Sequence, residues 1–155
     1  MKNITEKLKG YASETILAEA QALDSLTEVV DDSFGEAVAL MAQCRGRIVV
    51  SGVGKSAIIA QKMVATLNST GTPALFLHSA DAVHGDMGMI GRDDIVLFIS
   101  KSGNTGEIKR LFPFIKMMGN TVVSIVSCRE SFLGTHSDYL ICVPVGKEAG
   151  PDNLA

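Results

Sequence analysis

Three short polar segments in this sequence place glycines and hydroxyl or imidazole side chains after apolar runs. They are SGVGKS at 51–56, HGD at 84–86 and SKSGNT at 100–105. Free amides at the start of a helix attract anions, and hydroxyl groups donate hydrogen bonds to phosphate oxygens. If the segments meet at one edge of a sheet, they predict a binding site for a small phosphomonoester.

The segment 51–56 is not a nucleotide-binding P-loop, because that motif requires glycine at position 49 and this chain has Val49. A tight glycine turn into a helix remains, in which backbone amides and Lys55 can face an anion or a developing oxyanion. An ordinary glycine-rich turn with a solvated lysine fits this motif equally well. Ser51, Gly52 and Lys55 are the candidates for ligand contact here.

The segment 100–105 is suited to holding a phosphate. Its candidate ligand contacts are Ser100, Ser102, Gly103 and Thr105. The following helix would direct its positive end toward the dianion, and the hydroxyls would donate to its oxygens. Capping of that helix by Asn104 or Thr105 is the simpler alternative, and capping is compatible with binding.

Two glutamates are expected near the same edge of the sheet. Glu107 falls one turn inside the helix after the segment 100–105, where it can also complete a capping arrangement. Glu148 follows the last apolar run, within GKEAG at 146–150. That position makes Glu148 a candidate general base.

Two of the three histidines, His78 and His84, are expected at this edge, whereas His136 is not. Histidines six residues apart can share a metal ion, but the spacing matches no strong ligand signature. Zinc at His78 is therefore a minority alternative, and we expect that no cofactor is required.

Five apolar runs predict the strands that position these segments. They are RIVVS ending at Ser51, ALFLH ending at His78, DIVLFIS ending at Ser100, TVVSIVS ending at Ser127 and DYLICV ending at Val143. Stretches of helical periodicity separate them. Near-continuous apolar strands that alternate with helices predict a doubly wound, three-layer α/β sandwich around a five-stranded parallel sheet.

Helices are expected before and between these strands. Apolar positions that recur from Ile4 to Val29 predict a long N-terminal helix, and a second helix is expected from about Asp31 to before Gly46. Pro113 falls inside a later helix, which it should kink or deprive of a hydrogen bond.

The composition of the chain indicates a globular protein and argues against several kinds of partner. A chain of 155 residues with 46% hydrophobic residues is typical of one globular domain, and a net charge of −3 without a long basic run argues against nucleic acid as a partner. A polar start and the lack of a long apolar stretch predict a cytoplasmic protein with no membrane association. Cys44, Cys128 and Cys142 lack metal or redox spacing, and we expect all three in the core.

Together these residues resemble a sugar isomerase (SIS) domain, and within it the arabinose 5-phosphate isomerase family. The resemblance extends from about residue 14 to residue 155. It rests on SGVGKS at 51–56, STGTP at 69–73, HSADAVHGD at 78–86, SKSGNT at 100–105 and KEAG at 147–150.

The resemblance implies an aldose–ketose isomerase that interconverts D-arabinose 5-phosphate and D-ribulose 5-phosphate, toward the sugar Kdo of lipopolysaccharide or capsule. Such a reaction moves a proton between C1 and C2 through an enediolate, so it needs a base and a cation. The matched catalytic positions are Lys55, Glu107, Glu148 and His84, the matched substrate contacts are Gly71, Thr72 and His84, and the metal-sensitive position is His78.

In this resemblance each matched group has an expected role. Glu148 would be the proton-transfer base and Lys55 would stabilise the enediolate. Glu107 would position a hydroxyl or assist proton transfer. Ser79 and Gly150 stand where many members have proline and cysteine, and neither change removes a catalytic group.

Members of the resembling family are also longer than this chain. Members continue past Ala155 with a Ser/Thr-rich turn and a helix that bears another catalytic histidine, and longer members carry regulatory CBS domains. We therefore expect a fragment that lacks the C-terminal helix and has no CBS domains. The expected division is N-terminal helices at 1–45 that pack on the domain and a phosphosugar-binding core at 46–155. A homotetramer or dimer is expected, because sites of these domains commonly form between subunits.

Two other functions stay open. A non-catalytic phosphosugar sensor needs the segment 100–105 but no carboxylate base, so Glu148 and Lys55 favour the enzyme. An isomerase of another phosphosugar is not distinguished by the sequence.

Overall fold

The computed structural model describes residues 2–146 and 148. The chain divides into two compact units. One is Asp31–Pro144, which contains the sheet, and the other holds the N-terminal helix and the segment from Val145. Packing of the long N-terminal helix on the domain stays a prediction.

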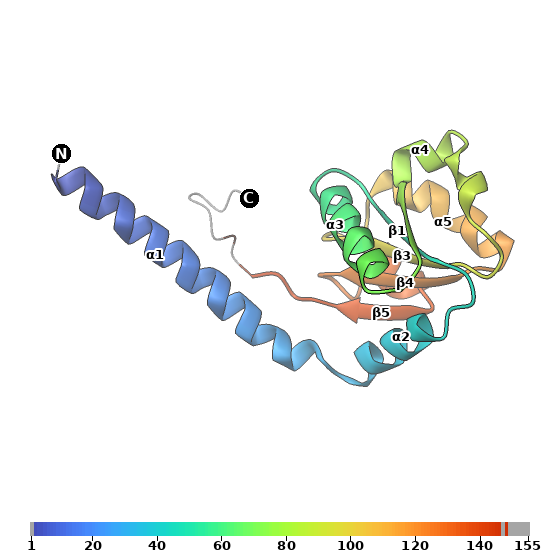
Figure 1. Cartoon of the computed structure of the whole chain (residues 1–155), viewed down its shortest axis with the longest axis horizontal. Helices are drawn as coiled ribbons and strands as arrows, with labels where there is room; N and C mark the ends of the chain where they lie inside the picture. Colours follow the sequence, from blue (N-terminus) through green and yellow to red (C-terminus); the bar gives the residue numbers. More distant parts are fainter. Residues whose placement is uncertain (1, 147, 149–155) are drawn as a thin grey trace. The chain divides into compact units, whose positions relative to one another are not determined.

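The N-terminal unit contains one long helix. Helix α1 spans Lys2–Ser25, and the 3-10 helix η1 follows at Leu26–Val29 (Figure 1). The expected long N-terminal helix is thus confirmed. Its exposed large apolar side chains are Ile4, Leu8, Tyr11, Ile16, Leu17 and Leu23. Within residues 2–146 and 148, no helix combines the length and apolarity needed to cross a membrane.

The sheet has five parallel strands in the order β2-β1-β3-β4-β5. The strands are β1 Ile48–Gly52, β2 Ala74–His78, β3 Ile95–Ser100, β4 Thr121–Val126 and β5 Tyr139–Cys142. All five expected strands are confirmed. Apolar runs of this length form strands here because both faces of a parallel sheet are buried. Since the strands are parallel, their carboxyl ends form one edge.

Helices cover both faces of the sheet (Figure 1). They are α2 Asp32–Ala42, α3 Lys55–Ser69, α4 Ser79–Val83, η2 Asp86–Met89, α5 Gly106–Met118 and α6 Phe132–His136. Helices α2 and α3 share one face, where they line an apolar cavity of about 360 Å³ together with Leu97 of β3. The next residue, Phe98, points to the opposite face and stacks on Phe112 of α5. The expected doubly wound fold is therefore confirmed.

Helix α5 continues unbroken through Pro113. The proline lacks an N–H donor, which weakens a helix. Four apolar side chains on the inner face of α5 compensate by packing in the core. They are Ile108, Leu111, Phe112 and Ile115.

The expectation that all three cysteines lie in the core is wrong for two of them. Cys142 is buried in β5, but Cys44 is half-buried and Cys128 is exposed. Cys44 lies in the connection between α2 and β1, where its thiol is 3.4 Å from the carbonyl oxygen of Asp93. Cys128 lies in the loop after β4, outside the buried strand.

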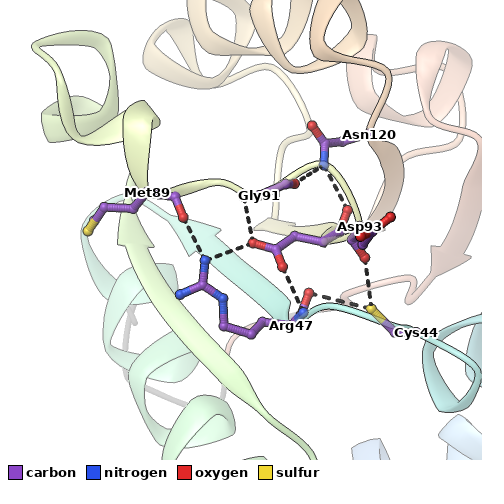
Figure 2. Close-up of polar contacts among 7 residues, drawn as sticks. Cys44, Arg47, Met89, Gly91, Asp93 and Asn120 are labelled. Carbon is purple, nitrogen blue, oxygen red and sulfur yellow. Dashed lines mark hydrogen bonds and ion pairs between the residues drawn. The ribbon is translucent and has the colours of Figure 1, made fainter.

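A hydrogen-bond network joins the starts of β1 and β3 at the amino edge of the sheet (Figure 2). Asp94 is 5% exposed and accepts hydrogen bonds from the backbone N–H of Arg47 at 2.7 Å and of Gly91 at 2.8 Å. The Arg47 guanidinium donates to Asp94 at 3.0 Å and to the Met89 carbonyl oxygen at 2.7 Å. Asn120 donates to the carbonyl oxygens of Gly91 and Asp94, both at 2.8 Å, which adds the start of β4 to the network.

Replacing Asp94 with alanine is expected to lower the free energy of unfolding by about 3 kcal/mol, because donors on Arg47 and Gly91 lose their buried acceptor. Burial raises the pKa of the Asp94 carboxyl, but hydrogen bonds from Gly91 and Arg47 and the charge of Arg47 outweigh burial, so the pKa lies below its usual value. A depressed folded-state pKa gives stability that is present above the unfolded-state pKa and lost as the pH falls through the folded-state pKa.

Urea denaturation near neutral pH and below about pH 3 measures both effects. The wild type should exceed Asp94→Ala in stability near neutral pH and lose much of that advantage in acid. Glu6→Ala, which removes only an exposed ion pair with Lys9, is the control and should change the stability by less than about 0.5 kcal/mol. Equal stability of Asp94→Ala and wild type near neutral pH would contradict the role of this network.

Candidate active site

The carboxyl ends of four adjacent strands bring most of the predicted site residues to one edge of the sheet. β2 ends at His78, β1 at Gly52, β3 at Ser100 and β4 at Val126. Neighbouring strands lie about 4.8 Å apart, so the segments that follow them are within reach of one small ligand. We call this the carboxyl edge.

A glycine turn places Lys55 at the first position of α3, on the carboxyl edge. Gly54 has a φ of 59° and a ψ of −129°, a conformation that residues with a Cβ rarely adopt. Gly52 packs against the start of α3, since a Cβ there would lie 3.0 Å from the carbonyl carbon of Ser56. The turn therefore requires both glycines, and Lys55 is exposed at the positive end of the helix.

Hydroxyl groups organise residues 100–105, which we call the cradle. The Ser100 side-chain oxygen accepts a hydrogen bond from the N–H of Gly103 at 3.1 Å and lies 2.9 Å from the Thr105 hydroxyl. The Ser102 hydroxyl accepts from the N–H of Asn104 at 3.2 Å. Thr105 is the N-cap residue of α5, but its side chain makes no capping hydrogen bond to any described residue. The first amides of α5, which have no acceptor inside the helix, therefore come directly after a segment that carries three hydroxyls.

The loop at 127–131 and the start of α6, which the sequence did not single out, hold the backbone of the cradle. Ser127 donates to the Lys101 carbonyl oxygen from both its N–H, at 3.0 Å, and its hydroxyl, at 2.5 Å. The N–H of Leu133 donates to the carbonyl oxygen of Gly103 at 3.0 Å. The position of the cradle thus depends on a loop that follows the next strand.

Ser131 in this loop packs directly against Gly103. It is 2% exposed, and its hydroxyl donates to the Cys128 carbonyl oxygen at 2.7 Å and accepts from the N–H of Gly134 at 3.1 Å. Ser131 is also the N-cap residue of α6. A serine before a short apolar stretch is the one sequence signal that points to this loop.

His78 and His84 flank α4 at the carboxyl edge. The His78 Nδ1 atom is buried, has no hydrogen-bond partner among the described residues and lies 3.6 Å from an Asp81 carboxylate oxygen. His84 follows α4 and is exposed. Within residues 2–146 and 148, no group of three or more His, Cys, Asp or Glu side chains is placed to hold a metal ion. Zinc at His78 stays a prediction.

Gly71 and Thr72 lie at the opposite, amino edge of the sheet. They precede β2, whose first residue Ala74 pairs with Ile48, the first residue of β1. Both line a cavity of about 130 Å³ that also contacts Cys44. One chain therefore does not bring these two predicted substrate contacts to the cradle.

Ser51 is fully buried at the end of β1, and its hydroxyl donates to the carbonyl oxygen of Leu77 at 2.6 Å. In this structure Ser51 supports the carboxyl edge from inside the protein. Contact of Ser51 with a ligand stays a prediction.

The two predicted glutamates lie in different compact units of the chain. Glu107 is half-buried in the first turn of α5, directly after the cradle. Glu148 is half-buried and belongs to the unit that contains α1. The proposed role of Glu148 as a base therefore depends on sequence resemblance alone.

The chain matches the family model of the SIS domain over residues 40–155. With the parallel sheet and its carboxyl-edge loops, this match shows that the chain belongs to the SIS domain family. It is 47% identical over 144 residues to a Pseudomonas aeruginosa protein named arabinose 5-phosphate isomerase KdsD, covering 93% of this chain and 44% of that protein.

Two further comparisons agree. The chain is 42% identical over 144 residues to a Haemophilus influenzae protein named probable arabinose 5-phosphate isomerase, covering 93% of this chain and 43% of that protein. The structure of Escherichia coli CFT073 c3406 in complex with arabinose 5-phosphate matches with a TM-score of 0.88 and 36% identity, covering 99% of this chain and 80% of that chain. The resemblance is confirmed, and the chain spans less than half the length of the curated relatives.

Proposed function

We propose that this chain forms the catalytic domain of an isomerase that interconverts D-arabinose 5-phosphate and D-ribulose 5-phosphate. The observation that carries the proposal is the similarity to relatives named arabinose 5-phosphate isomerases over 93% of this chain, which includes the cradle and Lys55. The geometry of the carboxyl edge agrees, because hydroxyls, helix amides and a lysine gather there.

In the proposed mechanism, the cradle and the amides that begin α5 bind the phosphate. Glu148 removes the proton from C2 of the open-chain aldose and delivers it to C1, while the hydroxyl proton on O2 moves to O1. The ammonium of Lys55 stabilises the negative charge that develops on the enediolate oxygens. Glu107 orients a sugar hydroxyl, and His84 contacts the substrate. No cofactor enters any of these steps.

We further propose that the reaction serves Kdo synthesis, for lipopolysaccharide or capsule, in the cytoplasm. This role is inferred from the substrate pair. Isomerases of other phosphosugars use the same enediolate chemistry, so competition with a hexulose 6-phosphate tests the choice of substrate.

A dimer or tetramer would reconcile Gly71 and Thr72 with the rest of the site. A strand of five residues spans about 16 Å, so residues at the amino edge cannot touch a pentose phosphate held at the carboxyl edge of the same chain. We propose that a second copy supplies them. Sedimentation velocity measures the assembly, and a chain that stays monomeric at the assay concentration would contradict this part of the proposal.

Replacing Lys55 with methionine tests the proposed function. The variant keeps most of the length of the unbranched side chain and removes its charge, so kcat should fall by about 10²- to 10³-fold, as expected for a lost oxyanion donor. Lys62→Met on the exposed side of the same helix is the matched control and should keep full activity. Equal kcat values for Lys55→Met and the wild type in a ketopentose assay would contradict the role of Lys55.

A further inference from the structure

Two buried serine hydroxyls meet between the end of β1 and the start of α4. Ser51 and Ser79 are both 0% exposed, and their Oγ atoms are 2.8 Å apart. The Ser51 hydroxyl also lies 2.6 Å from the carbonyl oxygen of Leu77, to which it donates. The two side chains therefore form a chain of hydrogen bonds that ends on β2.

The direction of these hydrogen bonds follows from the number of protons. A serine hydroxyl has one proton to donate, and Ser51 uses its proton for the Leu77 carbonyl oxygen. The proton between the two hydroxyls must then come from Ser79. Ser51 is the acceptor, and both buried donors are satisfied.

This pair connects two groups of predicted site residues. Ser51 immediately precedes the glycine turn that presents Lys55. Ser79 is the first residue of α4, which has His78 before it and His84 after it.

Helix α4 has five residues, which is too short to be stable by itself, so its position depends on tertiary contacts. Ala82, which is 1% exposed in the core, supplies one such contact, and the Ser79 hydroxyl supplies another.

We propose that Ser79 is a positioning residue that acts through Ser51 to fix α4, and with it His84, relative to Lys55. Its effect on turnover rests on the proposed function, whereas its effect on the order of α4 does not.

Amide hydrogen exchange and NMR of the histidine rings test this proposal without any activity. In Ser79→Ala, exchange at residues 80–84 should accelerate by about tenfold, the change expected for losing one buried hydrogen bond. The chain has only three histidines. The His84 ring signals should shift or broaden, while those of His136 stay in place.

A second hydroxyl pair, in which Ser124 is buried and Ser137 is half-buried, provides the control. Ser124 and Ser137 lie 2.7 Å apart between β4 and the end of α6. Ser137→Ala should accelerate exchange near α6 and leave α4 and His84 unchanged.

Kinetics with D-arabinose 5-phosphate give the second measurement. Ser79→Ala should lower kcat/KM by about five- to tenfold, mainly through KM, and leave the affinity for inorganic phosphate unchanged, because the cradle is intact. Adding Ser51→Ala to Ser79→Ala should cost less than Ser51→Ala costs in the wild type, because the hydrogen bond between the two hydroxyls is already lost and only the bond from Ser51 to the Leu77 carbonyl oxygen remains to be removed.

The outcomes separate this proposal from the proposed function. A wild type that makes no ketopentose would refute the proposed function, while exchange and the His84 signals would still decide the role of Ser79. Unchanged exchange at 80–84 and unchanged His84 signals in Ser79→Ala would overturn the positioning role, whether or not the wild type turns over.

Discussion

Replacing Gly103 with alanine is expected to lower the free energy of unfolding by about 3 to 4 kcal/mol. Gly103 has a φ of 63°, so a Cβ is strained there whatever space is available. The added Cβ would also lie 2.6 Å from the Cβ of Ser131, a buried residue that is hydrogen-bonded to its own loop. Movement of either loop opens the cradle, so the affinity for D-arabinose 5-phosphate should fall by at least about tenfold.

The matched control is Gly119→Ala. Gly119 also has a positive φ, 85°, but a Cβ there meets no heavy atom within 4 Å. This variant should therefore lose only about 1 kcal/mol and keep its affinity for the phosphosugar. Urea denaturation and isothermal titration measure the two quantities. Wild-type affinity in Gly103→Ala would show that the cradle does not hold the phosphate.

Replacing Glu148 with glutamine is expected to reduce kcat by about 10²- to 10⁴-fold, the range for loss of a general base. The amide has the same shape as the carboxylate but cannot accept the proton from C2. Binding of D-arabinose 5-phosphate should change by less than about threefold, because the phosphate contacts are intact.

Glu36→Gln, at an exposed position on α2, is the control for this experiment and should keep the wild-type kcat. A Glu148→Gln variant with wild-type kcat would exclude Glu148 as the base. Glu107 would then be the carboxylate to test.

The strands and the carboxyl edge were predictable because each strand is a near-continuous apolar run. Burial on both faces of a parallel sheet selects such runs, and it does so independently of the rest of the chain. Once the strands are parallel, the segments at 51–56, 78–86 and 100–105 must share an edge. The main features of the candidate site follow from local sequence in this way.

The support of the cradle was not predictable in the same way. Ser127 and Leu133 hold it through backbone carbonyl oxygens of Lys101 and Gly103, and any residue supplies a carbonyl. The pairing of Ser51 with Ser79 depends on the register of β1 against β2, which sets Ser51 beside Leu77. Contacts of this kind leave no periodic pattern in a sequence.

Predictions made from residue type alone were wrong where the position in the fold decides whether a side chain is buried. Cysteine is usually buried, yet Cys128 is exposed because it follows β4 in a loop at the carboxyl edge. Gly71 and Thr72 were grouped with the cradle by resemblance, although the direction of β2 puts them at the other edge.

The most direct test of the isomerase proposal is proton NMR of D-arabinose 5-phosphate incubated with the wild-type chain in D₂O. The proposed mechanism predicts that D-ribulose 5-phosphate forms, with deuterium at C1 wherever the base exchanges its proton with solvent before returning it. Binding of the phosphosugar at saturation without any ketopentose or deuterium uptake would contradict the isomerase and favour a phosphosugar sensor.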